Sequence, residues 1–224
     1  MNKIKLYKYL PEEYVDDFVT KGNIFFRNLT YFRQYEDNRR GDPLEGFHRD
    51  NPDNDVVLYS PNSGKIAKGD YSYLNSTNTD LIYVFCLSCV IKEELFTEFG
   101  TDFCVEISNL SEFSRRLKVG VKRRPFSYSS GLIQNNVKYY KDNAPADFDI
   151  KNPKNLAFAK GIHYCHQEEY RFVFGESKKA FNLKQQIVDN KKYDFIGEAK
   201  KGQPMDKTIC IGNIKNITAI HRGM

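Results

Sequence analysis

The chain has 224 residues, of which 40% are hydrophobic and 28% charged, and basic residues exceed acidic ones by 34 − 29 = 5. These proportions are typical of a globular protein and exclude a collagen-like, coiled-coil or wholly disordered chain. No apolar run reaches the roughly 18 residues that a membrane-spanning helix needs. Residues 1–10 are basic and end at Pro11, which is not the pattern of a secretory signal. We therefore expect a cytoplasmic protein with no membrane partner and with its five cysteines reduced.

Strand-like patterns recur along the whole chain, whereas helical patterns are few and short. Alternating or apolar runs predict strands over residues 4–10, 24–29, 56–59, 81–90, 103–107, 134–140, 169–174, 207–211 and 217–221. Helical spacing predicts helices over residues 11–20, 92–99 and 110–117, and a helical end over residues 155–161. Because repeated strand–helix–strand units are missing, we expect one α+β domain over residues 1–224, with mixed or antiparallel sheets.

Two long polar stretches interrupt this pattern. Residues 31–55 are rich in Gly, Pro and Asn, which predicts a loop or a short helix. Residues 61–79 are dense in Ser, Asn and Gly and lack apolar periodicity, which predicts a mobile loop. Loops of this length in a compact domain are often functional.

The sharpest local signal is the run from residue 167 to residue 175. Residues two apart on a strand share a face, so Gln167, Glu169 and Arg171 lie together. The opposite face carries Glu168, Tyr170, Phe172 and Phe174. The aromatic face belongs in the core, so the polar face should point at a cleft or at solvent. The alternative is an edge strand on which Glu169 pairs with Arg171 or with a lysine across the sheet.

The cysteines do not predict a metal site. Cys86 and Cys89 lie within the most apolar predicted strand, where a spacing of three places the two thiols on opposite faces. We expect these thiols to pack in the core. Cys104 and Cys210 also lie among apolar strand residues, and we expect both to be buried.

Two basic regions suit a nucleotide or nucleic-acid partner. Residues 115–124 hold six positive charges, which would bind phosphate or form a solvated basic turn. Residues 27–40 interleave arginines with aromatic residues, a combination that holds phosphate by charge and a base by stacking. Core aromatics beside surface arginines would give the same pattern.

Several short motifs occur in an order that resembles a bacterial family known as a domain of unknown function. They are a Leu-Tyr-Lys-Tyr opening at residues 6–9, Gly-Asp-Pro-Leu-Glu at 41–45, Phe-Cys-Leu-Ser at 85–88, Cys-Val-Glu-Ile at 104–107, a Val-x-Tyr strand at 137–139 and Glu-Glu-Tyr-Arg-Phe at 168–172. The resemblance covers about residues 6–174. The resemblance implies that the chain shares the fold of this family, but it assigns no activity to the chain.

A second resemblance is to the ADP-ribosyltransferase fold. That fold carries a basic residue on its first strand, a Ser or Tyr on a middle strand and a late (Gln/Glu)-x-Glu; Lys8, Ser88 and Gln167-x-Glu169 follow that order here. The resemblance implies NAD as substrate. It also implies that Glu169 faces the ribosyl cation, that Gln167 orients the acceptor and that Ser88 holds the ribose or positions Glu169. The residues that would bind NAD are Lys8, Tyr9, Tyr31, Phe32, Arg33, Arg39 and Arg40.

Three functions therefore stand side by side. The first is ADP-ribosyl transfer to a protein or nucleic-acid acceptor, or NAD glycohydrolysis, in an intracellular toxin or phage-defence effector. The second is a nucleotide- or nucleic-acid-binding module without catalysis. The third is a structural protein in which the late Glu-Glu-Tyr-Arg strand serves only the sheet.

Overall fold

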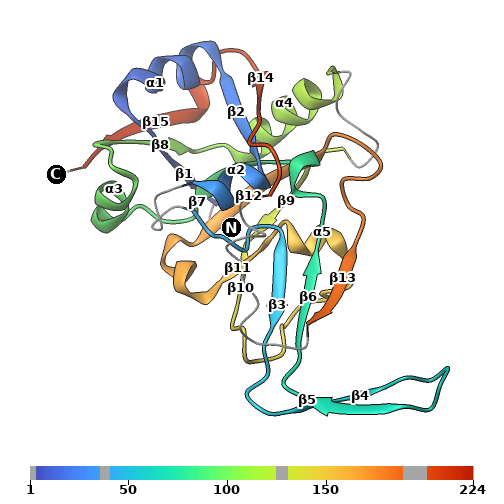
Figure 1. Cartoon of the computed structure of the whole chain (residues 1–224). Coiled ribbons are helices and arrows are strands. Elements are labelled where there is room, and N and C mark those ends of the chain that lie inside the picture. Colours follow the sequence, from blue (N-terminus) through green and yellow to red (C-terminus); the bar gives the residue numbers. More distant parts are fainter. Residues whose placement is uncertain (1–3, 36–40, 125–130, 189–200, 224) are drawn as a thin grey trace.

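Most strands of the chain pair antiparallel in one large sheet, as seen in a computed structural model that describes residues 4–35, 41–124, 131–188 and 201–223 (Figure 1). Its main path runs β14 (Asp206–Cys210), β2 (Asn23–Asn28), β7 (Ile82–Ser88), β1 (Leu6–Tyr9), β8 (Phe103–Ile107) and β15 (Thr218–Arg222). Along the other edge of β7 lies β12 (Glu169–Gly175), followed by β9 (Ile133–Asn136). The apolar strand predicted over residues 81–90 is thus the centre of the fold.

The sheet divides at β7. On one edge, β12 pairs with β7 along its whole length, from Ile82 to Ser88. On the other edge, β2 pairs at Tyr83 and Val84, and β1 pairs only at Ser88. Two strands therefore share one edge of β7 and diverge from it.

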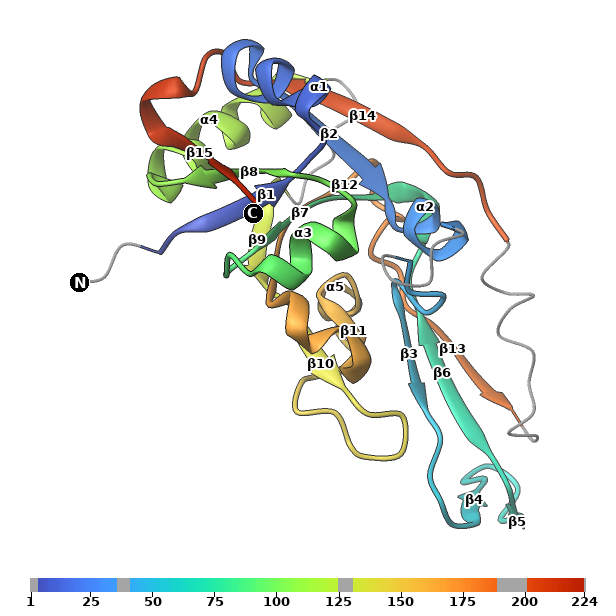
Figure 2. The same ribbon diagram turned by 90° about the vertical axis from the view of Figure 1, so that its left-hand side faces the viewer.

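Each face of β7 and β12 carries its own apolar core. The larger core joins Phe85 and Phe172 of the sheet to α4 (Leu110–Lys122), α1 (Glu12–Asp16) and the π-helical turn η1 (Asp17–Lys21) that follows α1. The smaller core joins Val84 and Val173 to α2 (Leu29–Gln34) and to Ala157 and Phe158, which directly follow α5 (Pro153–Leu156). Figure 2 shows α1 and α4 on one side of the sheet and α5 on the other. A third cluster packs α3 (Glu93–Phe99) against β1 and β8.

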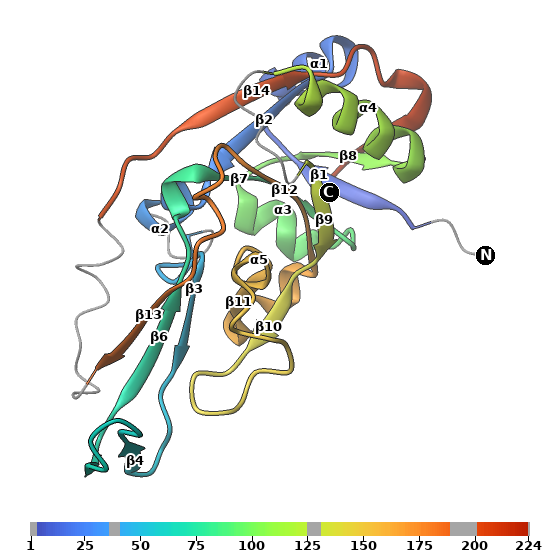
Figure 3. The same ribbon diagram turned by 90° about the vertical axis from the view of Figure 1, so that its right-hand side faces the viewer.

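Three smaller sheets extend from the side that carries α5 (Figure 3). They are β13–β6–β3 (Lys184–Val188, Ser72–Ser76 and Phe47–Asp50), the parallel pair β10–β11 (Lys138–Tyr140 and Ala159–Gly161) and the hairpin β4–β5 (Val56–Tyr59 and Ile66–Gly69). Short 3₁₀ turns complete the described elements: η2 (Thr79–Leu81), η3 (Ile162–Gln167) and η4 (Lys215–Ile217).

The α+β class, the mostly antiparallel sheets and the short helices are confirmed. The two polar stretches hold more structure than expected, because 31–55 includes part of α2 and all of β3, and 61–79 includes β5 and β6. The strand expected over 134–140 is two strands in different sheets. The division falls between Val137, whose amide donates to Glu169 O at the start of β12, and Lys138, whose amide donates to Phe158 O just before β11. Strand β13 has no counterpart among the sequence predictions.

The helix expected over 110–117 continues to Lys122 and takes in most of the basic run. Arg115 and Arg116 both pair with Glu112 on the preceding turn, at 2.7 and 2.6 Å. Cys104 is buried as expected, but Cys210 is exposed. The prediction for Cys210 was wrong because β14 is the last strand of the sheet and only one of its faces is covered. Ile209 lies on the covered face and is buried, whereas its neighbour Cys210 lies on the other face.

None of the helices within the described ranges has the length and apolar character to cross a membrane.

Candidate functional site

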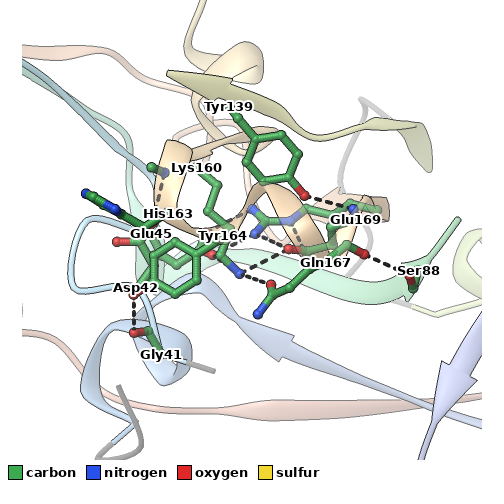
Figure 4. Close-up of polar contacts among 12 residues, drawn as sticks. Gly41, Asp42, Glu45, Ser88, Tyr139, Lys160, His163, Tyr164, Gln167 and Glu169 are labelled. Atoms are coloured by element: carbon green, nitrogen blue, oxygen red, sulfur yellow. Dashed lines mark hydrogen bonds and ion pairs between the residues drawn. The ribbon is translucent and has the colours of Figure 1, made fainter. Parts of the chain in front are cut away.

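A cluster of charged side chains fills the face of the β7–β12 pair that lies opposite the larger core (Figure 4). The period of β12 places Tyr170, Phe172 and Phe174 in that larger core, as predicted, and so directs Glu169 and Arg171 to the other face. Across the sheet, Glu169 lies opposite Ser88. This face is covered, because Glu169 is only 6% exposed and Arg171 only 1%.

Arg171 is the centre of the cluster. Its Nη1 and Nη2 donate to the two carboxylate oxygens of Glu45, at 2.9 and 2.6 Å. Its Nε donates to Glu169 Oε1 at 2.7 Å, Nη2 also reaches Glu169 Oε2 at 3.2 Å, and Nη1 donates to Ala157 O at 2.9 Å. All five N–H groups of the guanidinium therefore have acceptors, as a buried charge requires.

Lys160 supplies the second buried cation, from β11. Its Nζ donates to Glu169 Oε2 at 3.1 Å and to Gln167 Oε1 at 2.9 Å, and lies 3.7 Å from Glu45 Oε1. Its charge also faces the ring of Tyr164, 4.6 Å from the ring centroid. Four charged residues from three separate parts of the chain thus neutralise one another in the interior.

The two cations fix the ionisation state of Glu169. Burial opposes the charge, but Arg171 and Lys160 hold the pKa of the Glu169 carboxyl well below its ordinary value. Burial likewise opposes the charge of Lys160, whereas Glu169 and Glu45 raise the pKa of its ammonium. Glu169 is therefore a carboxylate, and Lys160 an ammonium, at any physiological pH.

Ser88 and Tyr139 hold the backbone around Glu169. Ser88 Oγ donates to Gln167 O at 2.7 Å, and the amide of Glu169 donates to Tyr139 Oη at 2.8 Å. Asp42 secures the turn that carries Glu45, because its Oδ1 accepts the amide of Leu44 at 2.8 Å. Ser88 and Asp42 are buried, whereas Tyr139 is half-buried.

The structure therefore brings together Ser88, Gln167 and Glu169, which were predicted as one set. The placement of Gln167 on the strand was wrong, because Gln167 ends η3 and β12 begins only at Glu169. The expectation that their face points to a cleft or to solvent was wrong, because the turn that carries Glu45, together with α5 and β11, covers it. The alternative was right about the Glu169–Arg171 ion pair but wrong about an edge strand, since β12 lies between β7 and β9.

Lys8 and Tyr9 lie apart from this set. Lys8 lies on the same face of its strand as Leu6 and Leu10, which belong to the larger core. Its Nζ donates to Cys86 O at 3.0 Å and lies 4.9 Å from the ring centroid of Phe85. The Lys8 ammonium therefore binds a carbonyl of β7 that lies between Val84, which pairs with β2, and Ser88, which pairs with β1. Tyr9 packs beside α3 and its hydroxyl donates to Val90 O.

The predicted nucleotide-binding residues of α2 also make internal contacts. The ring of Tyr31 faces the guanidinium of Arg27 at 4.0 Å, and Phe32 packs on the smaller core. Arg33 is buried and donates to Lys201 O at 2.8 Å. Arg39 and Arg40 lie outside the described residues.

Sequence reasoning missed two members of the cluster. Glu45 lies in the Gly-Asp-Pro-Leu-Glu turn, which carried the family resemblance without a role for this residue. Lys160 is a single charge in an otherwise apolar run from Leu156 to Gly161, and that isolation was the available signal. Their contacts with the rest of the cluster are long-range, and Glu45 is 126 residues from Arg171 in the sequence.

Within the described ranges, no group of His, Cys, Asp and Glu side chains is arranged to hold a metal ion. No protein-family model, curated protein or solved structure matches this chain.

Proposed function

We propose that the chain cleaves the nicotinamide–ribose bond of NAD at Glu169, on a fold of the ADP-ribosyltransferase type, and transfers the ADP-ribose to water or to a protein or nucleic-acid acceptor. The observation that carries the proposal is a carboxylate held ionised in the interior, with Gln167 and Ser88 beside it. An effector of this kind would act in the cytoplasm as a toxin or in phage defence.

The chemistry follows from charge. The bond from ribose C1′ to the nicotinamide nitrogen breaks, its electron pair leaves with nicotinamide, and C1′ becomes cationic. A fixed carboxylate facing C1′ stabilises that transition state without reorganising. A nucleophile then adds to C1′ and gives up its proton to solvent.

Oε2 is the oxygen of Glu169 offered to the substrate. Its contacts with Arg171 and Lys160 are 3.2 and 3.1 Å long, whereas Oε1 is held at 2.7 Å by Arg171 Nε. A ribose hydroxyl can take the place of the Lys160 contact while Arg171 keeps the carboxylate oriented. Since Glu169 is 6% exposed, the substrate enters only when the covering turn moves.

The test is nicotinamide release from NAD by the purified protein, with transfer of labelled ADP-ribose to added protein or nucleic acid as a second readout. Glu169→Gln should lower turnover about 10²–10³-fold. The matched control is Glu168→Gln, since the Glu168 side chain is 45% exposed and pairs with Lys92 at the surface. Rates are referred to the folded fraction, measured by circular dichroism. Absence of nicotinamide release, or full turnover by folded Glu169→Gln, would refute the proposal.

A further inference from the structure

The basic run over residues 115–124 stands apart from the rest of the chain in its charge. It holds six arginines and lysines and no acidic residue. The remainder of the chain has 34 − 6 = 28 basic residues against 29 acidic ones, a net charge of −1. The whole positive excess of the protein is therefore concentrated in this run, of which residues 115–122 lie in α4.

The helix directs three of these cations to one side. Its inner side packs into the larger core through three apolar residues, Phe113, Leu117 and Val121. On its outer side, Arg115, Lys118 and Lys122 are exposed, and their spacings of three and four residues place them in one stripe. The helical rise separates them by about 4.5 and 6 Å along the axis. Figure 3 shows α4 on the outside of the large sheet, so this stripe faces away from the body of the protein.

The acidic groups of α4 do not neutralise the stripe. Glu112 is the only acidic residue of the helix, and its carboxylate is already shared by Arg115 and Arg116. The side chains of Lys118, Lys122 and Arg123 make no ion pair or hydrogen bond with the part of the chain that the structure describes.

Helix stability does not account for these charges. Lys118 and Lys122 are like charges four residues apart, which destabilises a helix. The helix macrodipole favours cations only in the last turn, so it accounts for Lys122 and Arg123 but not for Lys118. The stripe therefore carries charge that the folded protein does not itself use.

A linear polyanion fits a straight row of cations better than a membrane does. The backbone of a nucleic acid presents one negative charge about every 3.4 Å along each strand of a duplex, so successive cations of the stripe can each meet a phosphate. A helix that binds a membrane surface needs an exposed apolar face beside its cations. The apolar face of α4 is buried, and Val119 is its only large exposed hydrophobic residue.

We propose that the outer side of α4, with Arg115, Lys118, Lys122 and Arg123, is a docking surface for the phosphate backbone of a nucleic acid. Contacts to phosphate alone carry no sequence information, so binding is independent of base sequence. The surface does not rest on the proposed activity, because α4 and the Glu169 cluster lie on opposite faces of the large sheet.

The test is fluorescence anisotropy of labelled oligouridine RNA and of labelled duplex DNA, titrated with the purified protein between about 50 and 200 mM salt. The wild type should bind at low salt, with an affinity that falls as salt rises. The triple variant Lys118→Ala/Lys122→Ala/Arg123→Ala should bind RNA at least tenfold more weakly, and its slope of log K against log salt should be shallower by about 2, since each phosphate contact contributes about 0.7. Binding of either probe with these changes supports the proposal, and the tighter complex identifies the nucleic acid.

The matched control removes the same number of charges elsewhere. Lys141, Lys151 and Lys154 are exposed and lie in or near α5 and β10, on the other side of the sheet. The triple variant Lys141→Ala/Lys151→Ala/Lys154→Ala should bind as the wild type does, after the small uniform effect of net charge. Circular dichroism and thermal unfolding establish that every variant is folded.

A gain of binding is a second, independent readout. Glu112→Gln removes the carboxylate that neutralises Arg115 and Arg116, so this variant should bind more tightly and with a steeper salt slope than the wild type.

Three results would overturn the docking surface. They are a wild type that binds neither probe at about 50 mM salt, equal affinities of the two triple variants, and weaker binding by folded Glu112→Gln. Vesicles that contain phosphatidylserine are the comparison for a membrane, and binding to vesicles without binding to either nucleic acid would also overturn it. None of these measurements involves NAD, so this proposal and the proposed activity fail separately.

Discussion

His48 is the least satisfied ionisable residue of the described chain. It is 1% exposed, and neither ring nitrogen has a hydrogen-bond partner within the described residues. Its ring packs against Tyr140 and Phe148, with centroids 4.6 and 5.9 Å away. Asn75 lies opposite it across β3 and β6, also buried and also without a partner for its amide. Burial lowers the pKa of His48 from 6.5 to about 4.

This burial predicts a defined acid sensitivity. Between pH 6.5 and about 4, the unfolded chain binds a proton at His48 that the folded chain refuses, so the free energy of unfolding falls as the pH falls. The full effect is about 3 kcal/mol. His48→Leu should remove this slope and raise stability at neutral pH, measured by urea denaturation at several pH values. The control, His163→Gln at an exposed position, should keep the wild-type slope. An unchanged slope in His48→Leu would show that His48 is protonated in the fold.

Glu169 has a structural role whether or not it is catalytic. Replacing it by Gln leaves Lys160 and Arg171 buried with one carboxylate fewer, and breaking a buried ion pair in this way costs about 3–5 kcal/mol. We expect Glu169→Gln to lower the free energy of unfolding by roughly 3 kcal/mol, and Glu168→Gln to change it by less than about 0.5 kcal/mol. Denaturant titration of both variants measures the difference. If the two variants were equally stable, the ion pairs of Glu169 would make no net contribution to the free energy of unfolding.

At the scale of elements, the packing of α4 on β14 depends on a glycine. Gly120 lies within α4, where alanine is normally the better residue by about 1 kcal/mol. A Cβ at this position would lie 2.7 Å from Ile209 Cγ2 and 3.3 Å from Ile211 Cγ2. Ile209 is fully buried. The close approach of helix and strand therefore outweighs helix propensity.

Gly120→Ala should accordingly destabilise the protein by about 1–2 kcal/mol, the usual cost of overpacking, despite the gain in propensity. The comparison is Lys118→Ala, an exposed position on the same helix, which should change stability by less than about 0.5 kcal/mol. Thermal unfolding of the two variants is sufficient. A stabilised Gly120→Ala would show that α4 can shift away from β14 without cost.

At the scale of the whole molecule, the β4–β5 hairpin is the least supported part of the described chain. It pairs with no other strand, and Val57, Tyr59 and Ile66 are all more than 60% exposed. An isolated two-stranded hairpin is marginally stable in water. The next strand, β6, is by contrast the central strand of its sheet and buries Leu74. The segment 61–79, which was predicted to be mobile, therefore contains the weakly held strand β5 and the firmly held strand β6.

Limited trypsin digestion should cut first at Lys65 or Lys68, near the tip of the hairpin. The two fragments should stay together on gel filtration, because strands β1–β3 from before the cut are paired with strands β6–β8 from after it. Mass spectrometry of the early products locates the cut. Fragments that separate into two folded halves would contradict the single domain.

The sequence by itself determined the strands of the large sheet and the sidedness of β12. The three aromatic residues Tyr170, Phe172 and Phe174, with Glu169 and Arg171 at alternate positions, were enough to assign the faces, because strand geometry has a period of two. The apolar run over residues 81–90 was enough to place a central strand, since only a buried strand tolerates so few polar groups. These features depend on neighbours in the chain.

Only the tertiary structure decided what lies on the polar face of β12. Glu45, Lys160 and Arg171 are distant in sequence, and no local rule predicts that one guanidinium will bind two carboxylates in the interior. Whether Glu169 is open or covered depends on how the turn at residues 41–45 folds over the sheet, which is a matter of long-range packing. The charge pattern in the sequence is the same for a surface ion pair and for a buried one.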